Sequence, residues 1–142
     1  MTVGSIKENI NIERRVAITL ESAKNIIALG LNINLEKNYA NHLGINDKQF
    51  EELGVRFYDS SSEVIDNSRL LLKVNCPSDE EIKSLKEKTI LVGIFNPTKN
   101  ENKLKEILKK NVSIFSLELL PRISRAQSMD VLSSQSNLAG YR

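Results

Sequence analysis

The chain has 142 residues, of which 40% are hydrophobic and 27% are charged, a balance typical of one globular domain rather than a disordered chain. Its 20 basic and 18 acidic residues are interspersed and only 5% of residues are aromatic, which argues against a nucleic-acid-binding protein. The single cysteine rules out an internal disulfide, and no membrane-spanning stretch or secretory leader is recognisable, so we expect a cytoplasmic protein.

The first half of the chain alternates between strand-like and helix-like patterns. Residues 2–6 form a short apolar strand candidate, and the segment that ends at Gly30 has the three-and-four spacing of a helix. Residues 31–37 alternate apolar and polar side chains, which is the period of a strand. Residues 45–54 predict a short helix with Asp47 as its N-cap.

The alternation continues to the end of the chain. Nearly continuous apolar runs predict strands that are buried on both faces, and serine caps with amphipathic spacing predict the helices between them. The predicted segments in chain order are strand 55–59, helix 60–68, strand 69–77, helix 79–88, strand 89–95, helix 100–111 and strand 112–120.

This pattern predicts the fold class. Strands that alternate with helices and are apolar throughout favour an α/β fold with an open, mainly parallel sheet and helices on both faces, a flavodoxin-like lobe. No repeat and no second domain boundary interrupts residues 1–142. Right-handed crossovers bring the carboxyl ends of the strands to one edge, where open α/β sheets bind their ligands.

Two basic residues lie where strand-like segments meet this edge. Lys73 follows three leucines, and a lysine buried there costs free energy unless it is paired. Arg15 precedes another apolar segment, where its guanidinium could hold a carboxylate with two hydrogen bonds. The alternative for both is that they reach water at the ends of strands, and the spacing favours neither interpretation.

Other kinds of site find little support. His42 is the only histidine and Cys76 the only cysteine, so no metal site with the usual ligand spacing is expected. The six glycines form neither a GxGxxG nor a GxxxxGK motif, so no loop that cradles a pyrophosphate is encoded. We therefore expect no complete dinucleotide site within these residues, and no catalytic residue can be assigned.

The last stretch, "PRISRAQSMDVLSSQSNLAGYR", holds a dense set of polar side chains after the final predicted strand. A polar loop or helix from Ser124 would place Gln127, Asp130 and Ser134 on one face, with Arg122 just before it. Such an amide, carboxylate and hydroxyl could bind a carboxamide, while a solvent-exposed helix end is the simpler interpretation.

This stretch, together with "ERRVAIT" and "LLLKVNCP", resembles the NAD(H)-binding alpha subunit of proton-translocating NAD(P) transhydrogenase. The long terminal match is the most specific element, whereas "RVAIT" and "LLLKV" are shared with alanine dehydrogenases. The resemblance implies the N-terminal lobe of the alanine dehydrogenase/transhydrogenase type. It also implies direct hydride transfer from NADH to NADP, coupled to proton translocation. Arg122, Gln127, Asp130 and Ser133 would then contact the nicotinamide.

The resemblance also implies cofactors and partners. NAD(H) would be held together with a dinucleotide-binding domain that follows in the family, and NADP(H) by a separate component. The partners would be the rest of the alpha subunit, a membrane-embedded beta subunit and a second copy of the NAD(H)-binding component. Because that dinucleotide-binding domain is absent from residues 1–142, we expect a fragment that is inactive alone. We also expect the protein to lie in the cytoplasm and to attach to the inner membrane through its partner subunits.

Two alternatives remain at this stage. One is a lobe of an alanine dehydrogenase-like oxidoreductase, in which Arg15 and Lys73 would match the residues that bind the substrate. Asn96 stands in the region where that family carries a histidine for proton transfer, which argues against this alternative. The other is a free-standing module for dimerisation or interaction, without catalysis.

Overall fold

A computed structural model of the protein describes residues 1–119. Its strands are β1 (Thr2–Ser5), β2 (Asn32–Glu36), β3 (Arg56–Tyr58), β4 (Leu70–Leu72), β5 (Ile90–Gly93) and β6 (Ser113–Ser116). Its α-helices are α1 (Leu20–Ala28), α2 (Asp47–Glu51), α3 (Ser61–Asp66), α4 (Asp79–Ser84) and α5 (Glu101–Lys109), with 3₁₀ turns η1 (Asn41–Leu43) and η2 (Leu117–Leu119). None of these helices, within residues 1–119, is long and apolar enough to cross a membrane.

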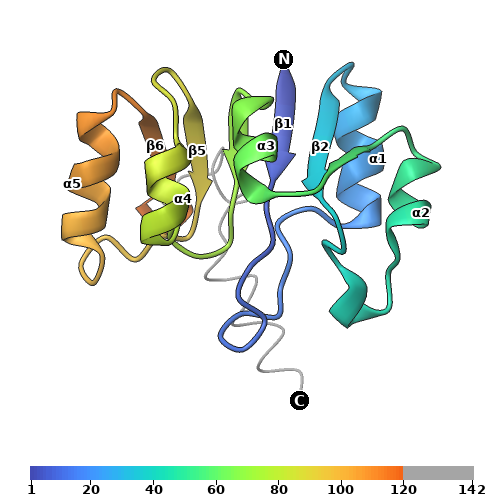
Figure 1. The fold of residues 1–142 in the computed structure, drawn as a ribbon, viewed down its shortest axis with the longest axis horizontal. Helices are drawn as coiled ribbons and strands as arrows, with labels where there is room; N and C mark the ends of the chain where they lie inside the picture. Colours follow the sequence, from blue (N-terminus) through green and yellow to red (C-terminus); the bar gives the residue numbers. More distant parts are fainter. Residues whose placement is uncertain (120–142) are drawn as a thin grey trace.

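The six strands form one parallel sheet in the order β3-β2-β1-β4-β5-β6 (Figure 1). The chain first moves outward from β1 through β2 to β3, and it then crosses back to β4 on the other side of β1. The predicted open parallel sheet is confirmed. The strand order, with its reversal between β1 and β4, is that of doubly wound α/β proteins, which bind ligands outside the carboxyl ends of the strands at this reversal.

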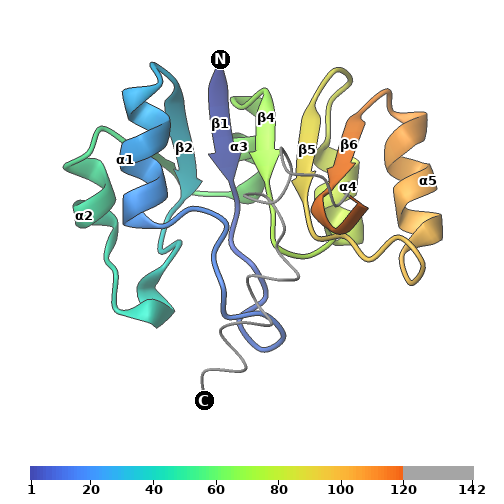
Figure 2. The same cartoon turned by 180° about the vertical axis from the view of Figure 1, so that it is seen from behind.

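Helices flank both faces of the sheet, as predicted. The chain reverses its winding direction between β3 and β4, and the general preference for right-handed crossovers then places the helices of the two halves on opposite faces. Helices α1 and α2 pack on one face, and α3, α4 and α5 lie on the other (Figures 1 and 2). Two apolar clusters fill the spaces between the layers. Phe50 of α2 and Leu35 of β2 are fully buried in one cluster, and Phe95 and Leu91 are fully buried in the other.

One region of the sheet has no helix over it among residues 1–119. Figure 2 shows the face of β5 and β6 that is turned away from α4, and no described helix lies in front of it. Phe115 on β6 is 56% exposed, and Ile90 and Val92 on β5 are half-buried. Apolar side chains in the middle of a sheet normally pack against a second layer.

Two local predictions were wrong. The N-cap of α2 is Asn46: its side-chain oxygen accepts a hydrogen bond from the backbone amide of Gln49, and the side-chain oxygen of Gln49 accepts one from the backbone amide of Asn46. The carboxylate of Asp47 instead accepts a hydrogen bond from the backbone amide of Asn38. Asparagine caps a helix as well as aspartate does, so residue type alone could not decide whether Asn46 or Asp47 is the N-cap. The last strand ends at Ser116 rather than at residue 120, because the chain turns into η2.

Candidate functional site at the carboxyl edge of the sheet

The carboxyl ends of β1 and β4 lie side by side at the centre of the sheet, where the strand order reverses. The segment that follows β1 reaches α1 through a long loop below this edge (Figure 1). Lys73 directly follows β4, and the segment that carries Arg15 belongs to the loop. The structure therefore brings both predicted basic residues to the edge where this fold binds ligands.

Lys73 is buried and paired, so the predicted cost of an isolated buried lysine is avoided. Its side chain is 4% exposed, and its Nζ lies 2.9 Å from Oε2 of Glu8 and 3.5 Å from Oε1 of Glu81. The other oxygen of Glu8 accepts the backbone amide of Val74 at 2.6 Å. A buried ammonium between two carboxylates is stabilised by charge-assisted hydrogen bonds. This cluster ties the loop after β1 to the end of β4 and the start of α4.

A third carboxylate, Glu36 at the end of β2, is buried near this cluster. Burial raises the pKa of its carboxyl; Lys7 and Lys73 oppose the rise, whereas Glu81 adds to it. Glu36, Glu8 and Glu81 line a hollow of about 520 Å³ beside the strand ends. Within residues 1–119 no group of three or more histidine, cysteine, aspartate or glutamate side chains could hold a metal ion.

Replacing Glu36 with glutamine should stabilise the protein at neutral pH. A carboxyl whose pKa is raised on folding binds more protons folded than unfolded, so its ionisation lowers stability as the pH rises through the folded pKa. Below the unfolded pKa, about 4, both states are protonated and the gain should vanish. Urea unfolding of wild type and Glu36→Gln between pH 3.5 and 8 measures this difference. A gain that does not change with pH would contradict the assignment.

Arg15 forms its two-pronged pair with a glutamate of its own chain. Its Nε donates to Oε1 of Glu13 and its Nη2 to Oε2, each at 2.8 Å, and the Arg15 backbone amide donates to Oε1 at 3.0 Å. The side-chain hydrogen bonds from Arg15 hold the pKa of Glu13 below its usual value, against the effect of burial. Arg15 thus holds Glu13 of its own chain, and the expectation that Arg15 is a cleft residue stays a prediction.

Tyr39 holds the loop that carries Arg15 against the sheet. Its hydroxyl accepts the backbone amides of Ala17 and Ile18, both at 3.1 Å, and lies 2.7 Å from Oγ of Ser5. Ser5 in turn donates to the carbonyl of Leu72 at 2.7 Å. Burial raises the pKa of the Tyr39 hydroxyl to about 12. One phenol therefore connects β1, β4 and the loop, in the neutral form that can both donate and accept.

Replacing Tyr39 with phenylalanine should lower the free energy of unfolding by about 2 kcal/mol, because two backbone amides and a serine hydroxyl lose their common partner. Hydrogen exchange should locate the loss at the amides of Ala17 and Ile18. Tyr58→Phe is the matched control, since no hydrogen bond of the Tyr58 hydroxyl occurs within residues 1–119, and it should change stability by less than about 0.5 kcal/mol. Equal effects in the two variants would contradict this role.

Sequence patterns missed the acidic partners and Tyr39. Glu8 and Glu13 lie in a polar segment that looked like an ordinary loop, and no local spacing linked them to Lys73 or Arg15. His42 lies in η1, with its Nε2 2.7 Å from the carbonyl of Arg14. The predicted nicotinamide residues lie outside the described residues and stay a prediction; they are Arg122, Gln127, Asp130 and Ser133.

The sheet order and the loop-lined carboxyl edge define the chain as a doubly wound α/β lobe. A family model described as "Alanine dehydrogenase/PNT, N-terminal domain" matches residues 4–139. The chain belongs to this family.

Known relatives agree with the family assignment. An NAD(P) transhydrogenase alpha-subunit chain of Rickettsia prowazekii is 37% identical over the whole chain, which spans 38% of that protein's length. The alanine dehydrogenase of Methanococcus maripaludis is 27% identical over 99% of the chain and 37% of its own length. A transhydrogenase from Sinorhizobium meliloti superimposes with a TM-score of 0.92 at 36% identity, over 99% of this chain and 42% of that one.

The predicted resemblance to transhydrogenase alpha subunits is therefore confirmed, and the alanine dehydrogenases are more distant relatives. The chain spans well under half the length of these proteins.

Proposed function

We propose that the chain is the N-terminal lobe of the NAD(H)-binding component of a proton-translocating NAD(P) transhydrogenase. The observation that carries this proposal is the match to transhydrogenase alpha subunits over the whole chain, at 37% identity and, for a solved structure, a TM-score of 0.92. On this proposal, a dinucleotide-binding domain would complete the NAD(H) site. NADP(H) would be bound by a separate, membrane-embedded beta subunit, which would attach the component to the inner membrane.

The described residues do not fit a whole dinucleotide. Residues 1–119 contain no glycine-rich loop at a helix start to bind a pyrophosphate. Hydride transfer is chemistry that the nicotinamide supplies, and the protein's role is to position it and exclude water. We therefore assign to this lobe one wall of the cleft, in which Arg122, Gln127, Asp130 and Ser133 would orient the nicotinamide.

The two ion pairs at the carboxyl edge, of which only the pair of Lys73 and Glu8 is buried, favour this function over amino-acid oxidation. A dehydrogenase that binds a substrate carboxylate through Arg15 and Lys73 needs both cations to face the ligand. Here Glu13 takes two hydrogen bonds from Arg15, and Glu8 and Glu81 flank Lys73. Displacing Glu8 would leave the buried charge of Lys73 without its nearest partner. The pair of Lys73 and Glu8 instead holds the loop after β1 in place beside the cleft.

The experiment is a hydride-transfer assay of the intact protein that carries this chain, combined with its NADP(H)-binding component. Asp130→Asn and Gln127→Leu should each lower the transfer rate from NADH to an NADP analogue by at least about tenfold, because they would disturb nicotinamide orientation. Lys105→Gln, on the exposed face of α5, should leave the rate unchanged. Turnover of alanine with NAD, without hydride transfer between dinucleotides, would overturn the proposal in favour of an amino-acid dehydrogenase.

A further inference from the structure

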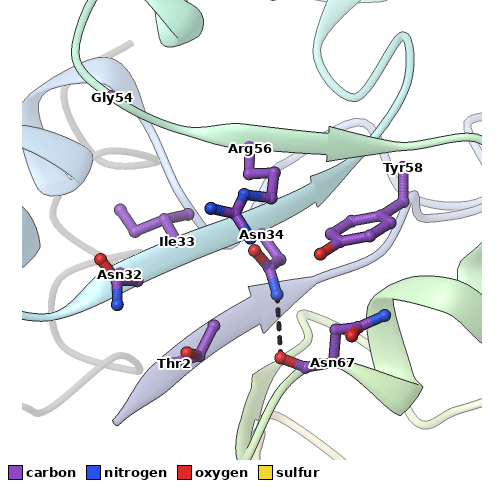
Figure 3. A pocket seen from close by; sticks show the side chains of 8 residues that line it. All are labelled: Thr2, Asn32, Ile33, Asn34, Gly54, Arg56, Tyr58 and Asn67. Carbon is purple, nitrogen blue, oxygen red and sulfur yellow. Dashed lines mark hydrogen bonds between the residues drawn. The ribbon is translucent and has the colours of Figure 1, made fainter.

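A small polar pocket lies at the amino edge of the sheet, at the opposite ends of the strands from the candidate cleft. It opens over β1, β2 and β3 on the face that carries α3, and its volume is about 160 Å³. Figure 3 shows the side chains that line it, among them Thr2, Asn32, Asn34, Arg56 and Tyr58. Pockets for drug-sized ligands and cofactors are typically about 300 to 1,000 Å³, so this pocket fits a small ion instead.

The parallel register brings these polar side chains together. Thr2 pairs with Asn32, and Asn34 pairs with Arg56, on adjacent strands. Side chains two residues apart on a strand share a face, so all four point to the same side of the sheet. The centre of a parallel sheet is normally apolar on both faces. Asn32 and Arg56 are exposed, so Asn34 is the one residue of these four whose burial in the sheet packing alone does not explain.

Arg56 supplies a positive charge to this pocket. Its guanidinium has no carboxylate within 4.0 Å among the residues that the structure describes, and Figure 3 shows it extending over β2 toward Asn34. By contrast, Arg15 at the other edge is paired with Glu13. The planar guanidinium matches the geometry of an oxyanion and can donate two parallel hydrogen bonds to it.

Asn34 is a mostly buried residue whose side-chain oxygen supplies an acceptor. The residue is only 4% exposed, and its Nδ2 donates to the carbonyl of Asn67 at 2.9 Å and to Oγ of Ser68 at 3.3 Å. Its Oδ1 takes part in no hydrogen bond within residues 1–119, yet no polar side-chain atom there is both fully buried and without a partner, so Oδ1 must reach the pocket. A ligand seated against both Arg56 and Asn34 needs acceptor oxygens and one proton to donate.

We propose that this pocket binds hydrogen phosphate, either as the free ion or as a phosphate group whose organic moiety lies outside. Arg56 donates to two phosphate oxygens, and Oδ1 of Asn34 accepts the P–OH proton. Sulfate has nearly the same shape but carries no proton at neutral pH, so Asn34 would face it with an unpaired oxygen. The pocket should therefore prefer phosphate to sulfate, because bound sulfate would cover the Asn34 oxygen without pairing it, and an acceptor buried in this way is costly.

The test is a phosphate titration of the intact protein, followed by NMR through the backbone amides of Asn32, Asn34 and Arg56. We expect saturable shifts when inorganic phosphate is added to the wild-type protein. Sulfate should bind the wild-type protein at least about tenfold more weakly than phosphate does, and phosphate should bind Arg56→Gln at least about tenfold more weakly than it binds the wild type. Arg69→Gln is the matched control: Arg69 precedes β4 at the same edge, is exposed and does not line the pocket, so this variant should bind normally.

The outcomes separate the possibilities. If glycerol phosphate competes with inorganic phosphate for the pocket, the ligand is a phosphate ester. If glycerol phosphate does not compete, the ligand is the free ion. Both results support the proposal. No saturable shift up to about 10 mM phosphate would overturn it. Equal affinity for sulfate and phosphate, or equal losses in Arg56→Gln and Arg69→Gln, would also overturn it, because the charge of the edge alone would then explain binding.

Discussion

Replacing Lys73 with methionine should lower the free energy of unfolding by about 4 kcal/mol, because it removes one partner of a buried ion pair and leaves the other charged. Lys73 and Glu8 have side chains that are only 4% and 5% exposed, and their charged atoms are 2.9 Å apart. Methionine keeps the length of the lysine stem and its packing. The loss therefore measures the uncompensated carboxylate rather than a cavity.

The measurement is urea unfolding of the purified protein at neutral pH, with two companion variants. Adding Glu8→Gln to Lys73→Met removes the unpaired charge and should recover more than half of the loss, since replacing both members of a buried pair is far less costly. Lys105→Met removes a lysine whose partner Glu101 is 3.1 Å away and 68% exposed, and it should cost less than about 0.5 kcal/mol. A similar small loss in Lys73→Met would show that the buried cluster does not stabilise the carboxyl edge.

Replacing Gly93 with alanine should cost about 3 kcal/mol, although it adds a single methyl group. The new Cβ would overlap the backbone carbonyl of Lys73 and lie 2.5 Å from Cε1 of Phe95. Neither neighbour can move easily: the amide of Lys73 bonds to Val92 at 2.9 Å, and Phe95 is fully buried. Overpacking at a rigid position forces the strands apart and is destabilising.

Urea unfolding and hydrogen exchange together test the Gly93→Ala prediction. The amide of Lys73, which donates to the carbonyl of Val92, and the amide of Ile94, which donates to the carbonyl of Val74, should lose protection beyond the global change. Ser113→Ala is the control on the neighbouring strand: Ser113 is exposed, and its substitution should stay within about 0.5 kcal/mol. If Gly93→Ala loses less than about 1 kcal/mol, the two strands must be able to separate enough to admit a methyl group.

The two predictions concern the same place in the fold. Gly93 ends β5 beside Lys73, which follows β4, and the carbonyl of Lys73 fills the space that a side chain at position 93 would need. The buried ion cluster and the close approach of two strands therefore fix the end of β4 independently. In the proposed transhydrogenase lobe, this rigid edge would form the base of the nicotinamide cleft.

The alternation of strands and helices could be predicted from the amino-acid sequence alone, because it depends on local periods of two and three to four residues. Ser78 and Glu81 form the predicted capping box, and Gly30 and Gly54 adopt the positive φ expected where helices end. The long terminal match also identified the family. These features depend on neighbours in the chain, so a single sequence contains them.

The roles of the charged residues, by contrast, became clear only from the tertiary structure. Lys73 meets Glu8 across 65 positions, and Asn34 and Arg56 meet on adjacent strands, through a sheet order that local patterns do not encode. Sequence patterns left Arg15 and Lys73 open between binding a ligand and reaching water, and neither interpretation included glutamate partners from the same chain. The physical reason is that a charge takes the partner that the fold brings within about 4 Å. For Lys73 that partner is set by the pairing of β1 with β4 and by the loop after β1, and for Arg15 it is set by the conformation of that loop.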